Sequence, residues 1–171
     1  MGVDEVELIE LWNADREKAY ELFAAFPEDD NGFENIAYGM DREEFDALVE
    51  RKRLASEGIG LPEGFVPDTV YLLSDGGNYV GIFNFRHELN DFLKNGPGHI
   101  GYGIAPGWRM KGYATRGLDL LIDKVSPLIR EDEIYLSVNK DNPASLSTQL
   151  RAGGRIHHED DSKYYVRIGK R

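Results

Sequence analysis

One continuous segment, residues 98–125, constrains the fold of this chain more than any other part of the sequence. Residues 98–104 have the pattern of a strand, a short loop follows, and residues 112–125 have the spacing of an amphipathic helix. The apolar residues of that helix recur on one face: Ala114, Leu118, Leu121, Ile122 and Val125. A strand that leads through a glycine-containing loop into such a helix predicts an α/β domain in which the helix N-terminus points at the loop.

The loop before this helix carries two basic residues, Arg109 and Lys111, followed by Gly112. Its context resembles a P-loop, but Tyr113 and Ala114 stand where a P-loop requires lysine and serine or threonine, which disfavours NTP hydrolysis. The free N–H groups of the helix start, together with the two cations, would bind a pyrophosphate without a metal ion. An alternative is that the basic turn only caps the helix, and the spacing alone favours the two interpretations equally.

Hydrophobic periodicity divides the chain into strands and helices in the order βααβββαβαββ. Strands are predicted at residues 6–11, 69–74, 79–88, 98–104, 134–138, 155–158 and 163–168. Helices are predicted from Asn13 or Asp15 to Phe26, from Asp41, from Gly112 to near Pro127, and from Asn142 to Gly153. Asp41 and Glu44 have the spacing of a capping box. No repeat or linker interrupts this order, so residues 1–171 are expected to form a single domain.

Composition excludes several classes of protein. The net charge is −11 with a pI near 4.8, which disfavours nucleic acid as a partner and favours a cationic or amine substrate. The absence of cysteine excludes disulfides, thiolate zinc sites and a cysteine nucleophile. No apolar run approaches the roughly 20 residues of a membrane span, and the start of the chain lacks the pattern of a signal peptide. We therefore expect a cytoplasmic protein with no membrane partner.

The loop also carries a family signature. Arg109, Met110, Lys111, Gly112, Tyr113 and Ala114 fit the pattern Arg/Gln-x-x-Gly-x-Gly/Ala, and Asn142 and Ser145 follow later in the chain. In these residues the sequence resembles the GNAT superfamily of N-acetyltransferases. The resemblance extends from residue 98 to residue 154. The resemblance implies a GNAT-like mixed, mostly antiparallel twisted sheet of about seven strands. About four helices would flank this sheet, which would be splayed between its fourth and fifth strands.

The resemblance further implies the activity and the cosubstrate. A GNAT-like chain would transfer the acetyl group of acetyl-CoA directly to a primary amine of a small molecule or peptide, without a metal; a homodimer is left open. The implied cofactor-binding residues are Ile104, Arg109, Met110, Lys111, Gly112, Tyr113, Ala114, Thr115, Asn142 and Ser145. Helix capping is the alternative role of Asn142, and a polar residue of the first helical turn that of Ser145. The alternative function is a catalytically weak or inactive CoA-binding or sensory module on the same fold.

The resemblance identifies the catalytic residues less directly than the cofactor-binding residues. Many family members carry a tyrosine seven residues after the asparagine, where this chain has Gln149, and a glutamate base near the position of His99. His99 is therefore the candidate general base, with a purely structural hydrogen-bonding role as the alternative. On a strand, His99, Gly101 and Gly103 would share one face, and the glycines would leave room for pantetheine and substrate.

The candidate acceptor-binding residues lie at the end of the strand predicted over residues 79–88. They are Arg86, Glu88 and Asn90, with solvated surface as the alternative for each. No metal site is expected, because adjacent strand residues such as His157 and His158 would point to opposite faces of the sheet.

Overall fold

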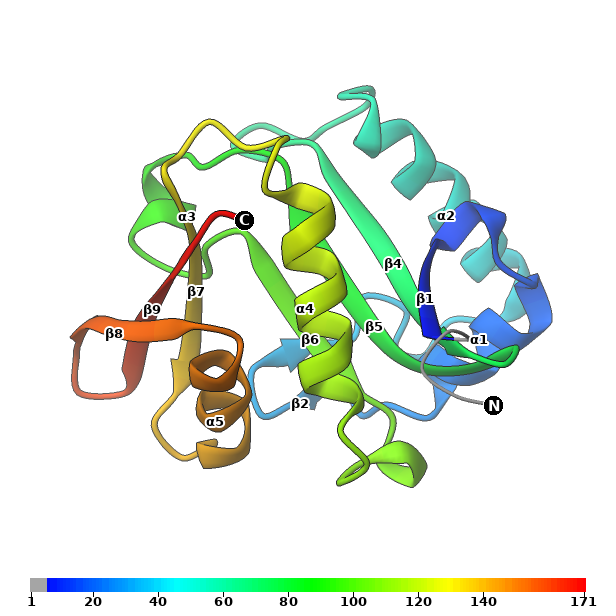
Figure 1. Cartoon of the computed structure of the whole chain (residues 1–171). Helices are drawn as coiled ribbons and strands as arrows, with labels where there is room; N and C mark the ends of the chain where they lie inside the picture. The colour runs from blue at the N-terminus through cyan, green and yellow to red at the C-terminus, as the bar shows by residue number, and fades with distance from the viewer. Residues whose placement is uncertain (1–5) are drawn as a thin grey trace.

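A computed structural model describes residues 6–171 and has the mixed α/β architecture shown in Figure 1. The strands are β1 (Val6–Glu10), β2 (Asp29–Asp30), β3 (Phe33–Glu34), β4 (Asp68–Asp75), β5 (Asn78–Arg86), β6 (Ile100–Ile104), β7 (Glu133–Asn139), β8 (Gly154–Glu159) and β9 (Lys163–Gly169). The α-helices are α1 (Arg16–Ala24), α2 (Arg42–Ser56), α3 (Asp91–Lys94), α4 (Tyr113–Val125) and α5 (Pro143–Arg151). The seven strands and four longer helices expected from the sequence are all present; the β2–β3 hairpin and the short α3 were not predicted.

The long strands form two sheets that separate between β6 and β7. One sheet has the order β1-β4-β5-β6 and the other β7-β9-β8, and each ladder within them is antiparallel. Between β6 and β7 there is one isolated bridge, Gly98 to Leu136. Because β6 and β7 are the fourth and fifth of the predicted strands, this separation confirms the expected splay.

Two hydrophobic cores cover the two faces of the larger sheet. One core packs Leu118, Leu121 and Ile122 of α4 with residues of both sheets, including Phe83 and Leu136. This shared core holds the two halves together across the split, and Figure 1 shows α4 lying over that face. The second core joins α1 and α2 to the opposite face and includes Phe23, Phe45, Leu72 and Ile82.

Local signals in the sequence fix several helix ends. Asp41 accepts a 2.8 Å hydrogen bond from the Glu44 amide and donates its own amide to Glu44, so the predicted capping box is confirmed. Asp15, rather than Asn13, caps α1. Within residues 6–171, none of the helices has the length and apolar character needed to cross a lipid bilayer.

Candidate active site

In the described part of the chain, the split leaves one edge of β6 without a partner strand. The Ala105 amide donates to the Val80 carbonyl, and hydrogen-bonding direction alternates along an antiparallel strand. The N–H groups of Tyr102 and Ile104 therefore point away from β5 and toward β7. An unpaired edge of this kind can accept an extended ligand as an additional strand.

The N-terminus of α4 lies beyond the end of β6 and offers further free amides. Gly112 is the N-cap residue with φ +84°, and its position would give an added Cβ no neighbour within 4 Å. None of the amides of Tyr113, Ala114 and Thr115 donates to a protein acceptor in the described part of the chain, as expected for the first turn of a helix. Met110, with φ +62°, is fully exposed. This open turn has the geometry of an anion site.

Arg109 does not extend over that turn. Its Nε donates to the Ile104 carbonyl at 3.1 Å, and its Nη2 forms an ion pair with Asp30 of β2. On the other side of the hairpin, the Asn139 side chain donates to Asn31 at 3.3 Å. The β2–β3 hairpin is thus tied to both sides of the split and covers the opening between them.

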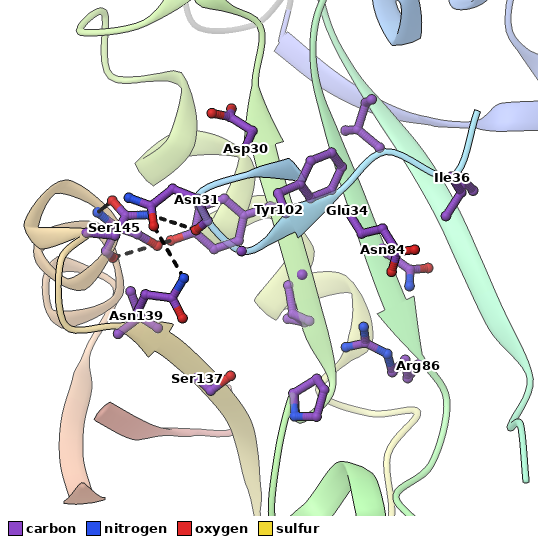
Figure 2. A pocket seen from close by; sticks show the side chains of 18 of the residues that line it. Asp30, Asn31, Glu34, Ile36, Asn84, Arg86, Tyr102, Ser137, Asn139 and Ser145 are labelled. Carbon is purple, nitrogen blue, oxygen red and sulfur yellow. Dashed lines mark hydrogen bonds between the residues drawn. The ribbon is translucent and has the colours of Figure 1, made fainter. Parts of the chain in front are cut away.

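A cavity of about 290 Å³ lies beneath this hairpin, between β5, β6, β7 and α5 (Figure 2). Among its lining residues are three of the candidates from the sequence, Arg86, Asn142 and Ser145. Gly101 also lines it, so the glycine face of β6 does point to the cavity. At Gly103, a Cβ would approach Phe33 and Phe26 to about 3 Å, so that glycine makes room for the hairpin.

A tyrosine occupies the part of the cavity nearest α5. The Tyr102 hydroxyl lies 2.8 Å from Ser145 Oγ (Figure 2), and its ring stacks on Phe83. Burial raises the pKa of Tyr102, although hydrogen bonds with Ser145 and Gln149 act in the opposite direction, so the phenol is protonated at neutral pH. Gln149 is itself 1% exposed and lines the same cavity. A phenol from β6 therefore lies beside the residue that replaces the family's tyrosine.

The opposite end of the cavity, which we call its floor, contains Asn84 and Arg86 from β5 (Figure 2). Asn84 Oδ1 is buried and has no hydrogen-bond partner among the described residues. Arg86 Nη1 donates to the Gly98 carbonyl at 3.1 Å, and burial lowers the pKa of this guanidinium. Sequence reasoning missed Asn84 and Tyr102. For Asn84 a signal existed, because it is a polar residue two positions before Arg86 within an apolar strand.

The structure corrects the orientation expected for His99. Its side chain is fully buried and is not part of the cavity wall. Nε2 lies 2.8 Å from Glu131, and Nδ1 accepts the Tyr135 amide at 2.9 Å. His99 precedes the first residue of β6 and fills the closed end of the split, so the side-chain alternation of the strand does not extend to it. Because both ring nitrogens already have protein partners, this geometry supports the structural role and not that of a base.

The other expected acceptor residues also lie outside the cavity. Glu88 is exposed, and Asn90 caps α3 by accepting the Leu93 amide while it donates to the Gly64 carbonyl. His157 and His158 do not point apart, because a register shift in β8 brings their Nδ1 atoms to 2.9 Å. Within residues 6–171 no group of three or more metal-ligating side chains is formed.

The buried histidines predict a pH dependence of stability. Burial lowers the pKa of His99 and His87 below 6.5, so the unfolded chain binds more protons in mildly acidic solution. We expect the free energy of unfolding to fall as the pH drops below about 6.5. The slope should decrease in His99→Gln, measured by urea denaturation between pH 5.5 and 7.5, whereas His157→Gln on the surface is the matched control. An unchanged slope in His99→Gln would contradict the burial argument.

The divided antiparallel sheet, the open turn at α4 and the cavity at the split agree with the mixed α/β fold that the sequence resemblance implies. The acetyltransferase (GNAT) domain family matches residues 5–155, and the chain belongs to this family. No curated protein sequence matches it significantly.

Solved structures with the same fold share little sequence with this chain. The ribosomal L7/L12 alpha-N-protein acetyltransferase RimL in complex with coenzyme A is 15% identical, with 96% of this chain and 93% of that chain covered and a TM-score of 0.69. The microcin C7 self-immunity acetyltransferase MccE, with acetyl-CoA and AMP, is 15% identical over 98% and 93% of the two chains, with a TM-score of 0.71. Spermidine N-acetyltransferase from Vibrio cholerae, with CoA and spermine, is 14% identical over 98% and 97%, with a TM-score of 0.65.

Proposed function

We propose that this chain is an acetyl-CoA-dependent N-acetyltransferase that transfers an acetyl group directly to a primary amine. The observation that carries the proposal is the unpaired edge of β6, which runs between the free amides of the α4 N-terminus and the cavity under the β2–β3 hairpin. A cofactor with an anionic end and an extended arm fits the first two features, and a small acceptor fits the third.

Acetyl-CoA would bind with its pyrophosphate on the backbone amides of residues 110–115. The helix start favours negative charge there, and Lys111, stacked at 5.5 Å over Trp108, is the nearby cation. The pantetheine arm would pair with the open edge of β6, with Asn142 and Ser145 on the α5 side. Arg109 would position the end of β6 through its bond to Ile104 and would not contact the phosphates directly.

The reaction follows from groups that line the split. A neutral amine attacks the thioester carbonyl, and the Ile104 N–H group at the open edge of β6 would donate to the developing oxyanion. When the C–S bond breaks, its electron pair remains on sulfur as a thiolate, and the extra amine proton passes to water. The Tyr102 hydroxyl would accept a hydrogen bond from Ser145 Oγ and donate its own proton to that thiolate in place of the Ser145 carbonyl oxygen.

One observation favours the second candidate, a CoA-binding or sensory module without turnover. Gln149 stands where many family members have the tyrosine that serves the leaving thiolate. Tyr102 has a phenol beside Gln149 that could serve the thiolate instead, which is why we favour the enzyme.

A thiol-release assay with acetyl-CoA and a panel of primary amines tests the proposal. We expect turnover that is unchanged by EDTA, because the proposed site uses amides and cations to hold the phosphates. Calorimetry with acetyl-CoA should show binding at micromolar affinity under the same conditions. Binding without release of thiol for every amine would favour the sensory module, and a strict requirement for a divalent cation would contradict the proposed phosphate site.

A further inference from the structure

The floor of the cavity contains a cation that no carboxylate of the described residues neutralises. Among residues 6–171, Arg86 forms no ion pair, and the one hydrogen bond of its side chain runs from Nη1 to the Gly98 carbonyl. The guanidinium is part-buried and points into the cavity (Figure 2). Buried charges in proteins are normally paired, because removing an ion from water without a partner costs several kcal/mol. Arg86 therefore lacks a partner of negative charge.

The acidic residues of the cavity wall do not supply that partner. Asp68, which faces Arg86 across the β4–β5 ladder, is bound by Lys52 Nζ at 2.6 and 2.8 Å. Asp30 is paired with Arg109. The two remaining charged residues of the lining, Glu34 on the exposed hairpin and Lys163, have opposite signs. The positive charge of Arg86 thus remains in excess at the cavity floor, although the whole chain carries −11.

A second unsatisfied group lies beside the first. Asn84 Oδ1 is buried and has no donor among the residues that the structure describes, and Asn84 precedes Arg86 by two residues on the same face of β5. Two residues along a strand place their side chains about 7 Å apart. Asn84 is also directly opposite Gly101 of β6, where the missing side chain leaves access from the cavity. The Asn84 side chain, which carries this acceptor oxygen, thus lies about 7 Å from the Arg86 side chain, close to β6, the strand that would hold the thioester.

We propose that the amine acceptor of this protein also carries an anionic group, a carboxylate or a phosphate, which binds Arg86 while its amine or a neighbouring N–H donates to Asn84. This inference rests on the proposed acetyl transfer and names the substrate class for it. The fork of a guanidinium matches both anions, because it presents two parallel N–H donors. Small amino acids and amino phosphates satisfy both groups, whereas a polyamine would place a cation against Arg86. The net negative charge of the chain favours a cationic substrate instead, but that charge describes the whole surface and not the cavity floor.

Matched pairs of acceptors test this inference. Each α-amino acid is compared with its amide and with its decarboxylated amine, and phosphoethanolamine is compared with ethanolamine. We expect kcat/KM to be at least about 10-fold higher for the anionic member, the size of one charge-assisted hydrogen bond. The amino acid and phosphate pairs distinguish the two sources of the anion. Equal rates for both members of every pair would overturn the inference and leave acetyl transfer intact.

Substitution of Arg86 tests whether this residue causes the preference for anionic acceptors. Arg86→Gln retains a donor for the Gly98 carbonyl but removes the charge, and we expect it to raise KM for the anionic acceptor about 10- to 100-fold with KM for acetyl-CoA unchanged. The exposed Arg151→Gln is the matched control for the loss of one positive charge. A preference that persists in Arg86→Gln would contradict the assignment.

A binding measurement separates this inference from the proposed function. The N-acetylated amino acid and its amide are titrated by calorimetry into the CoA-bound protein and into Arg86→Gln. If the carboxylate form binds more tightly than the amide and this difference disappears in Arg86→Gln, the result supports an anionic substrate. That support holds even if no amine is acetylated, and only the proposed transfer reaction would then be wrong. Equal binding of the two forms would overturn the inference.

Discussion

Gly112→Asp is expected to weaken acetyl-CoA binding by at least about 100-fold, equivalent to roughly 2.7 kcal/mol, while the protein remains folded. Gly112 caps α4 with φ +84°, and no atom lies within 4 Å of the place where a Cβ would be added. Aspartate tolerates this left-handed conformation better than most residues and is a favourable N-cap. Its carboxylate would nevertheless occupy the approach to the helix amides and repel the pyrophosphate.

The isosteric Gly112→Asn separates charge from volume. Asparagine tolerates the same backbone conformation and has nearly the same volume as aspartate but carries no charge, so we expect it to weaken acetyl-CoA binding less than aspartate does. Calorimetry with acetyl-CoA gives the affinities, and thermal unfolding shows whether the two variants are equally stable. Acetyl-CoA affinity in Gly112→Asp equal to that of the unaltered protein would show that the pyrophosphate binds elsewhere.

Tyr102→Phe is expected to lower kcat about 10- to 100-fold with little change in KM for acetyl-CoA. The estimate corresponds to the loss of one hydrogen bond to a charged group, about 1.5–3 kcal/mol. Phenylalanine keeps the stacking on Phe83, so the core beneath β6 is preserved. Burial raises the pKa of Tyr102, so the group lost is a neutral donor and not a phenolate.

Tyr165→Phe is the control for this substitution. Tyr165 lies on β9, and its hydroxyl donates to Asp160 in the turn between β8 and β9, outside the cavity, so its removal should leave kcat unchanged. Steady-state kinetics with the best acceptor identified in the panel provides both constants. If Tyr102→Phe retains full kcat, the thiolate leaves without the phenol, and the assignment of Tyr102 is wrong although acetyl transfer stands.

The order of secondary structure could be predicted from the sequence because its signals are local. The period-2 and period-3.6 patterns lie within single elements, and the capping box of Asp41 and Glu44 spans one helical turn. The loop from Arg109 to Gly112 is similarly local, because the free amides of a helix start follow from the helix itself. The β2–β3 hairpin escaped prediction because strands of two residues carry no periodicity.

The cavity and its chemistry depend on residues far apart in the chain. Tyr102 meets Ser145 across 43 residues, and Arg109 meets Asp30 across 79. The separation of the sheets at β6 creates the first contact, and the unpredicted hairpin creates the second. Neither contact has a signature in the separate segments, because each depends on how the elements pack.

The sequence by itself therefore determined the order of elements, the helix caps and the glycine turn of α4, because each depends on neighbouring residues. Only the tertiary structure decided the roles of His99, Tyr102 and Arg86. His99 is enclosed by Glu131 and Tyr135, which lie more than 30 residues away. Arg86 has no carboxylate partner within residues 6–171, because Lys52 binds Asp68. Burial and pairing of charges are properties of the packed molecule, since desolvation depends on every surrounding element.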